Sequence, residues 1–219
     1  MKAWLGGTFD PVHLGHINLA ERLLERLDLE NLFLMPCHLA VHKKSVSASP
    51  KQRLEMLKIA LDSRLGLFID DRELIADKPS FTYDSLVKIR AENADESISF
   101  IMGMDSLIGF SDWKNASLFS GLTNLIILER PGETFGMLEA SYLSHKRAAL
   151  NDLADFGFLQ VENKSGLQNS RSGKFAILDV GLFNISSSKI RSLVKEGHSI
   201  AHLVGDKVAD YIKLHHLYS

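Results

Sequence analysis

Residues 6–16 of the chain read GGTFDPVHLGH, and this stretch decides the fold. The apolar run at residues 3–5 predicts a strand before it, and apolar positions at helical spacing predict a helix over 15–27 after it. Gly6 and Gly7 let the backbone approach a ligand closely. The N-terminus of the helix offers N–H groups and a positive dipole end that favour an anion. The stretch therefore predicts a phosphate-binding turn.

Two histidines distinguish this turn from other phosphate-binding loops. It is not a Walker A loop, because no Gly-Lys-Ser/Thr follows, and it is not a GxGxxG fingerprint. His13 and His16 are three residues apart, so both imidazoles can face one phosphate if the helix begins near His13. The alternative is a surface turn that contains two histidines.

Short apolar runs alternate with longer amphipathic stretches along the rest of the chain. The pattern predicts further strands at 32–35, 68–69, 98–102, 125–128 and 175–180, and helices at 51–61, 83–91, within 106–119, and at 139–153, 188–195 and 206–215. Strands separated by helices indicate a parallel sheet. We therefore expect one α/β domain over 1–219, doubly wound, with a mostly parallel sheet and helices on both faces. Residues 163–173 have loop composition and are expected to be mobile.

The unusual residue clusters of the chain all follow predicted strands. They lie at residues 6–16, 36–44, 103–113, 130–132 and 184–191. In doubly wound sheets, ligands bind beyond the carboxyl ends of the strands. The common placement of the clusters predicts one composite site.

The composition indicates an ordinary globular protein without a strong overall electrostatic field. With 25 basic and 27 acidic residues the net charge is −2, so we expect no nucleic-acid or membrane partner. Cys37 is the single cysteine, which excludes an intramolecular disulfide and suits a reducing compartment. No signal peptide or membrane-length apolar run is expected. These features predict a cytoplasmic protein.

Two segments resemble the signatures of the nucleotidyltransferase superfamily that carries the HxGH motif. Residues 6–16 look like the first signature, and ISSSKIR at 185–191 looks like the second, with Ser188 where threonine is common. Nicotinate mononucleotide, phosphopantetheine and some cytidylyl transferases belong to this superfamily. The resemblance implies a Rossmann-like nucleotidyltransferase domain.

The middle of the chain resembles bacterial nicotinate mononucleotide adenylyltransferases. The segments that carry the likeness are GMDSL at 103–107 followed by Trp113, PSFT at 79–82 and RPG at 130–132. AVHK at 40–43 departs from the PPHK-like run of that family, because both prolines are missing. The departure leaves the rigidity of this loop open.

The resemblance implies transfer of the adenylyl group of ATP to nicotinate mononucleotide, which gives deamido-NAD and pyrophosphate in NAD biosynthesis. The implied catalytic residues are His13, His16 and Arg191. The implied ATP-binding residues are Gly7, Thr8, Phe9, His13, His16, Gly103, Asp105, Ser188 and Arg191. The implied mononucleotide-binding residues are His42, Lys43, Thr82, Trp113 and Arg130. Mg²⁺ is expected to be carried mainly on the ATP phosphates, without a dedicated protein site.

The implied chemistry needs no side-chain nucleophile, because the acceptor phosphate is already ionised at neutral pH. The site must instead neutralise charge and fix an in-line geometry. Two alternative functions remain open: adenylyl transfer to phosphopantetheine, and nucleotide sensing without catalysis.

Three residues or groups also have alternative roles. Trp113 is a candidate core aromatic, and Asp105 a candidate N-cap of a helix beginning near Ser106. Cys37 and His38 with His42 lack a recognised zinc spacing, so a metal site there is not expected.

Overall fold

β1 (Lys2–Gly7) is the strand that the sequence predicts before the glycine-rich turn. It pairs in parallel with β4 (Ile98–Gly103). Within the described residues the sheet has seven strands in the order β3 (Leu67–Ile69), β2 (Leu32–Pro36), β1, β4, β5 (Asn124–Glu129), β7 (Lys174–Asp179) and β6 (Leu159–Gln160). The order reverses direction between β1 and β4, which confirms the doubly wound α/β fold expected from the sequence.

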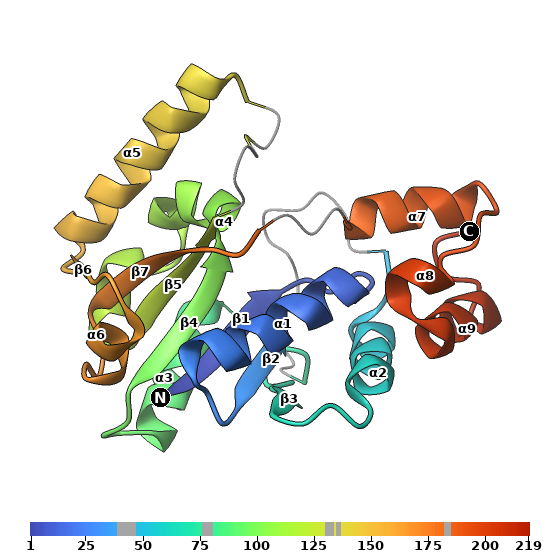
Figure 1. Ribbon diagram of the computed structural model, residues 1–219, viewed down its shortest axis with the longest axis horizontal. Helices are drawn as coiled ribbons and strands as arrows, with labels where there is room; N and C mark the ends of the chain where they lie inside the picture. Colours follow the sequence, from blue (N-terminus) through green and yellow to red (C-terminus); the bar gives the residue numbers. More distant parts are fainter. Residues whose placement is uncertain (39–46, 76–80, 130–133, 135–136, 182–184) are drawn as a thin grey trace. The chain divides into compact units, whose positions relative to one another are not determined.

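The structure is a computed structural model that describes residues 1–38, 47–75, 81–129, 134, 137–181 and 185–219 (Figure 1). Its chain divides into two compact units. The first unit consists of Met1–Leu5 and Phe81–Leu182, and the second of Gly6–Ser80 and Phe183–Ser219. The expectation of a single domain over 1–219 stays a prediction.

The first unit is built on the parallel pairs of β4 with β5 and of β5 with β7, which lie side by side (Figure 1). Both β4 and β5 are nearly continuous apolar runs, as expected of parallel strands that are covered on both faces. The helices of this unit are α3 (Thr82–Glu92), α4 (Met104–Ile108), α5 (Glu139–Asp155) and α6 (Lys164–Gln168), with the 3₁₀ helices η1 (Phe110–Asp112) and η2 (Ala116–Gly121).

The expectation that residues 163–173 form a loop throughout is wrong, because α6 lies within them, while their mobility stays a prediction. The Asn163 side chain accepts from the N–H of the third helical residue at 3.1 Å and so caps the helix. Leu167 is fully buried. The backbone oxygen of Arg171 accepts from Nη2 of Arg90 at 2.7 Å. One buried leucine, one capping bond and one long-range hydrogen bond hold a segment whose composition is typical of a loop.

The second unit holds the glycine-rich turn and the C-terminus. It contains β2 and β3, which pair in parallel, and the helices α1 (Leu14–Leu27), α2 (Pro50–Leu61), α7 (Ser187–Lys195), α8 (Ala201–Val204) and α9 (Asp206–Leu214). Helix α2 begins with a capping box of Ser49 and Gln52. It packs against α9 (Figure 1). Segments that are remote in sequence therefore meet within this unit.

Candidate active site

His13 and His16 lie at the start of α1 and cap it reciprocally. His13 is the N-cap, and its Nδ1 accepts from the backbone N–H of His16 at 3.3 Å. Nδ1 of His16 accepts from the backbone N–H of His13, also at 3.3 Å. The two rings stack with centroids 3.7 Å apart. Because Nδ1 is the acceptor in both rings, the neutral form of each carries its proton on Nε2. The arrangement therefore provides two imidazole N–H donors at one helix N-terminus.

Two glycines make room for the aromatic rings of the turn, Gly15 for His13 and Gly7 for Phe9. A Cβ added to Gly15 would lie 3.0 Å from Nδ1 of His13 and 3.4 Å from Cβ of Ile185. A Cβ added to Gly7 would lie 2.7 Å from the ring of Phe9, which in turn packs edge-on against His16 with centroids 5.0 Å apart. The glycines of the turn thus serve close packing of side chains, in addition to the backbone access expected from the sequence.

Asp10 lies at the centre of the hydrogen bonds that hold the turn. Its side chain is buried, and Oδ2 accepts from the backbone N–H of Ser47 at 2.8 Å. Oδ1 accepts from the N–H of Ala48 at 3.1 Å and from the hydroxyl of Tyr218 at 2.7 Å. A buried carboxylate with three donors is well satisfied. Asp10 therefore fixes the turn to the start of α2 and to the C-terminus.

The second signature reaches the same turn from α7. Ser186 is the N-cap of the helix, and Oγ of Ser187 donates to the backbone oxygen of Pro11 at 3.0 Å. Arg191 donates from Nη1 to the backbone oxygen of Asp10 at 2.7 Å and from Nη2 to Oγ of Ser188 at 3.2 Å. The structure thus brings the two signatures together in the second unit.

Arg53 is a buried residue of this region that the sequence analysis missed. It is 0% exposed, and its guanidinium donates to the backbone oxygens of Thr8 at 2.7 Å and His38 at 2.8 Å. It holds the residues after β1 against those after β2. Arg53 lies on the same face of α2 as the buried Leu57 and Leu61, because these residues are four apart. An arginine on this apolar face was the sequence signal for its burial.

Tyr218 is the second missed residue. It is buried next to the C-terminus of the chain and contacts Asp10 across 208 positions. Burial, as the larger cause, and the Asp10 carboxylate raise the pKa of Tyr218 well above its ordinary value of 10.0. Its hydroxyl therefore remains a donor at neutral pH. No local pattern in the sequence singles this tyrosine out.

Gly103 and Asp105 lie in the first unit, at the end of β4 and the start of α4. The helix begins at Met104 with Gly103 as N-cap, so the alternative that Asp105 caps a helix starting near Ser106 is wrong. Asp105 is exposed in the first helical turn. A Cβ on Gly103 would lie 2.4 Å from Oδ1 of Asp105. The glycine therefore leaves space for that carboxylate.

Thr82 and Trp113 also belong to the first unit. Helix α3 begins at Thr82, and its N-cap Phe81 makes no side-chain capping bond. Trp113 is half-buried and packs edge-on against Phe110 and Phe119, with ring centroids 5.5 Å and 6.2 Å apart. Trp113 thus joins an aromatic cluster, as its core interpretation expects, and its proposed contact with the pyridine ring stays a prediction.

Several expected site residues lie outside the described part of the chain. These are His42, Lys43 and Arg130. Among the residues that the structure describes, no group of three His, Cys, Asp or Glu side chains is placed to hold a metal ion. Cys37 lies with Sγ 3.7 Å from Oγ1 of Thr8. The other predicted site residues divide between the two units. The second unit contains Gly7, Thr8, Phe9, His13, His16, Ser188 and Arg191, and the first contains Thr82, Gly103, Asp105 and Trp113.

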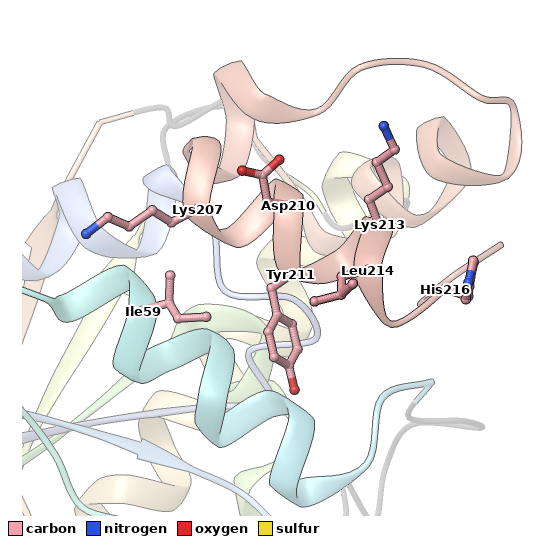
Figure 2. Close-up of a pocket in the computed structure, with 7 residues that line it drawn as sticks. All are labelled: Ile59, Lys207, Asp210, Tyr211, Lys213, Leu214 and His216. Atoms are coloured by element: carbon pink, nitrogen blue, oxygen red, sulfur yellow. The ribbon is translucent and has the colours of Figure 1, made fainter.

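A surface groove of about 670 Å³ lies between α2 and the C-terminal residues (Figure 2). Its lining is formed by Ile59, Lys207, Asp210, Tyr211, Lys213, Leu214 and His216. None of the residues predicted for the active site contributes to it. The groove is therefore separate from the cluster around Asp10.

Comparison with known proteins places the chain in a family. A family model described as cytidylyltransferase-like matches residues 4–193. The chain is 38% identical to a probable nicotinate-nucleotide adenylyltransferase of Psychromonas ingrahamii, over 98% of this chain and 95% of the relative. It is 36% identical to a protein of the same name from Cellvibrio japonicus, over 97% of this chain and 96% of the relative.

Solved structures share the fold. The nicotinic acid mononucleotide adenylyltransferase of Plasmodium falciparum complexed with NaAD aligns with a TM-score of 0.71, covering 99% of this chain and 96% of that chain at 18% identity. At this identity the likeness bears on the fold alone. In the described residues, no helix has the length and apolar character needed to cross a membrane.

Proposed function

The chain belongs to the cytidylyltransferase-like family and, within it, to the nicotinate-nucleotide adenylyltransferases, and from this premise we propose that it transfers the adenylyl group of ATP to nicotinate mononucleotide. The products are deamido-NAD and pyrophosphate, as a step of NAD biosynthesis. The observation that carries the proposal is the junction of the two signatures, in which Arg191 and Ser187 bond to the backbone of the turn that also bears His13 and His16. We propose that the enzyme acts in the cytoplasm and has no nucleic-acid or membrane partner.

The triphosphate of ATP is proposed to bind at the start of α1. Nε2–H of His13 and of His16 are the donors, and His16 contacts the α-phosphate as charge builds there in the transition state. The backbone of Gly7, Thr8 and Phe9 contributes further contacts, favoured by the positive end of the helix dipole. Fixed donors of this kind stabilise developing charge without reorganisation.

Arg191 and Ser188 are proposed to bind phosphate oxygens from α7. The Arg191 guanidinium is held on one side by the backbone oxygen of Asp10 and by Oγ of Ser188. A guanidinium whose plane is fixed in this way matches a phosphate with its remaining N–H groups. The acceptor phosphate then attacks the α-phosphate in line, and pyrophosphate leaves without a covalent enzyme intermediate.

Asp105 and Trp113 are proposed to bind the two nucleosides. Asp105 accepts from the ribose hydroxyls of adenosine, in the space that Gly103 leaves for its carboxylate. Trp113 stacks on the pyridine ring, and the N–H groups at Thr82 face the nicotinate carboxylate. The remaining proposed contacts to the mononucleotide are made by His42, Lys43 and Arg130.

Mg²⁺ is proposed to enter with ATP as the MgATP substrate. The buried Asp10 carboxylate already accepts three hydrogen bonds, so it is not suited to coordinate a cation as well. Magnesium bound to nucleotides commonly keeps several waters and needs few protein ligands. The chain's own residues would then hold the phosphates, and the ion would neutralise part of their charge.

The proposal is tested by product formation from MgATP with separate acceptors. Purified protein is incubated with MgATP and nicotinate mononucleotide, nicotinamide mononucleotide or 4′-phosphopantetheine, and released pyrophosphate is measured together with the dinucleotide by chromatography. We expect the highest kcat/KM with nicotinate mononucleotide. Turnover of phosphopantetheine alone would assign the chain to the other transferase, and MgATP binding without turnover of any acceptor would indicate a sensor.

A further inference from the structure

The C-terminus of the chain reaches the nucleotide-binding turn through one side chain. The hydroxyl of Tyr218 donates to Oδ1 of Asp10 at 2.7 Å, in a contact that is buried on both sides. Leu217, the preceding residue, is also buried. The tail after α9 is thus packed into the second unit at this point.

The backbone of the tail adopts conformations that side chains rarely take. His216 has φ 49° and Tyr218 has φ 66°, both in the left-handed region. Residues with a Cβ adopt this region uncommonly, mostly in turns and after helix ends. His216 directly follows the C-cap of α9, where a left-handed residue is common, and the Tyr218 side chain is held by Asp10.

Asp10 connects Tyr218 to Arg191, one of the residues proposed to bind phosphate. Its backbone oxygen accepts from Arg191, and the Asp10 carboxylate lies 4.0 Å from Nη1 of the same arginine. A change in the position of Asp10 therefore moves the acceptor that orients the Arg191 guanidinium. Arg53 holds the same turn, because its guanidinium donates to the backbone oxygen of Thr8 at 2.7 Å.

We propose that Tyr218 is a positioning residue for MgATP, which acts through Asp10 on the orientation of Arg191 and of the turn at residues 6–16. This inference rests on the proposed function, because binding of MgATP by this turn and by Arg191 is part of that proposal. Tyr218 itself touches no substrate. Its hydroxyl supplies one of the three donors that keep the Asp10 carboxylate in place.

The test is the Tyr218→Phe variant, with Tyr211→Phe as the matched control. Tyr211 is partly buried on α9 and lines the separate groove, so its variant removes a hydroxyl from the same unit without touching Asp10. The dissociation constant of MgATP is measured by calorimetry without an acceptor, so that no turnover is needed. We expect it to rise about tenfold for Tyr218→Phe, which loses a hydrogen bond to a charged group, and to stay within about twofold for Tyr211→Phe.

A double-mutant cycle with Asp10→Asn separates positioning from a general loss of structure. If Tyr218 acts through Asp10, the double variant binds MgATP no more weakly than Asp10→Asn alone. In steady-state assays, KM for nicotinate mononucleotide is expected to stay within about twofold in Tyr218→Phe, because that substrate is held by other residues. Both measurements are made at a temperature well below the melting temperature of every variant, so that all of them are folded.

Three outcomes would overturn the inference. They are unchanged MgATP affinity in Tyr218→Phe, equal losses in Tyr218→Phe and Tyr211→Phe, and additive losses in the cycle. An inactive wild-type protein would contradict the proposed function instead, and the MgATP affinities would still decide the role of Tyr218. If Asp10→Asn does not fold, the comparison of the two tyrosine variants decides alone.

Discussion

His13 and His16 each accept the backbone N–H of the other through Nδ1, at 3.3 Å in both directions. This reciprocal bond makes the two side chains a capping box for α1, a role usually filled by Ser or Thr with Glu or Gln. It also fixes the ring planes, which stack at an angle of 21°. The same pair therefore caps the helix and presents two Nε2–H donors. A mutation that tests the second role needs a control that retains the cap.

The first prediction separates capping from charge stabilisation at His16. We expect His16→Ala to lower kcat about a hundredfold, because one preorganised donor to a developing oxyanion contributes roughly 3 kcal/mol. His16→Gln keeps an N3 side chain that can complete the capping box but lacks the imidazole. It should recover the thermal stability that His16→Ala loses and leave kcat low. A variant with wild-type kcat would remove His16 from the mechanism.

A second prediction uses two glycines of the first unit as a matched pair. Gly103→Ala places a Cβ 2.4 Å from Oδ1 of Asp105, so the carboxylate must move. We expect KM for ATP to rise about tenfold, as for the loss of a hydrogen bond to a charged group. Gly109→Ala meets no atom within 4 Å and has an ordinary φ of −102°. Steady-state kinetics of both variants measure this effect. An equal change of KM for ATP in Gly103→Ala and Gly109→Ala would argue against a role of Asp105 in ATP binding.

The third prediction concerns the two possible roles of Trp113. If the exposed part of its ring stacks on the pyridine, Trp113→Ala should raise KM for the mononucleotide about tenfold and KM for ATP much less. A fall in melting temperature is also expected, because Trp113 packs against Phe110 and Phe119. Trp113→Phe retains an aromatic face and should restore most of the substrate affinity. Equal losses for both substrates would favour a purely structural role.

The fourth prediction is the preference for the acid over the amide. Helix α3 begins at Thr82 without a side-chain cap, so backbone N–H groups of its first turn are suited to a carboxylate. Replacing the charged acceptor by a carboxamide costs roughly 1.5–3 kcal/mol. We therefore expect kcat/KM for nicotinate mononucleotide to exceed that for the nicotinamide form at least about tenfold at saturating MgATP. Equal values would show that this helix start does not read the carboxylate.

The fifth prediction follows from the raised pKa of Tyr218. Burial and then Asp10 keep the hydroxyl protonated in the folded protein, whereas in the unfolded chain it ionises near its ordinary value of 10.0. The unfolded state therefore gains free energy from ionisation as the pH rises through about 10, and the stability that Tyr218 contributes is lost there. Melting temperatures between about pH 8 and pH 11 should fall more steeply for the wild type than for Tyr218→Phe. Parallel curves would contradict the assignment.

The local parts of the fold and site were readable from the sequence. Alternation of apolar runs and helical periodicity predict the strands and most helices, because the spacing of side chains along an element depends only on its own residues. The position of His13 relative to His16 is of this kind, and the helix predicted at 83–91 begins one residue earlier, at Thr82. The second signature was recognisable for the same reason, as a short contiguous segment.

Helix α6 shows the limit of such reasoning. Its residues have the composition of a loop, and the helix exists because Leu167 is buried and Asn163 caps it. Propensity is a weak determinant for five residues, and packing against the rest of the unit decides. The helix start before Asp105 likewise came two residues earlier than the capping argument placed it.

By itself, the sequence determined that a strand, a glycine-rich turn and a helix with two histidines follow one another, and that a serine-rich helix start lies near the other end of the chain. Only the tertiary structure decided which groups hold that turn. Asp10 is bonded to Arg191 and to Tyr218, which are 181 and 208 positions away, and Arg53 bonds to Thr8 from another helix. No local pattern encodes these pairs, since a buried carboxylate or guanidinium takes whichever donors and acceptors the packing of the whole unit brings within reach.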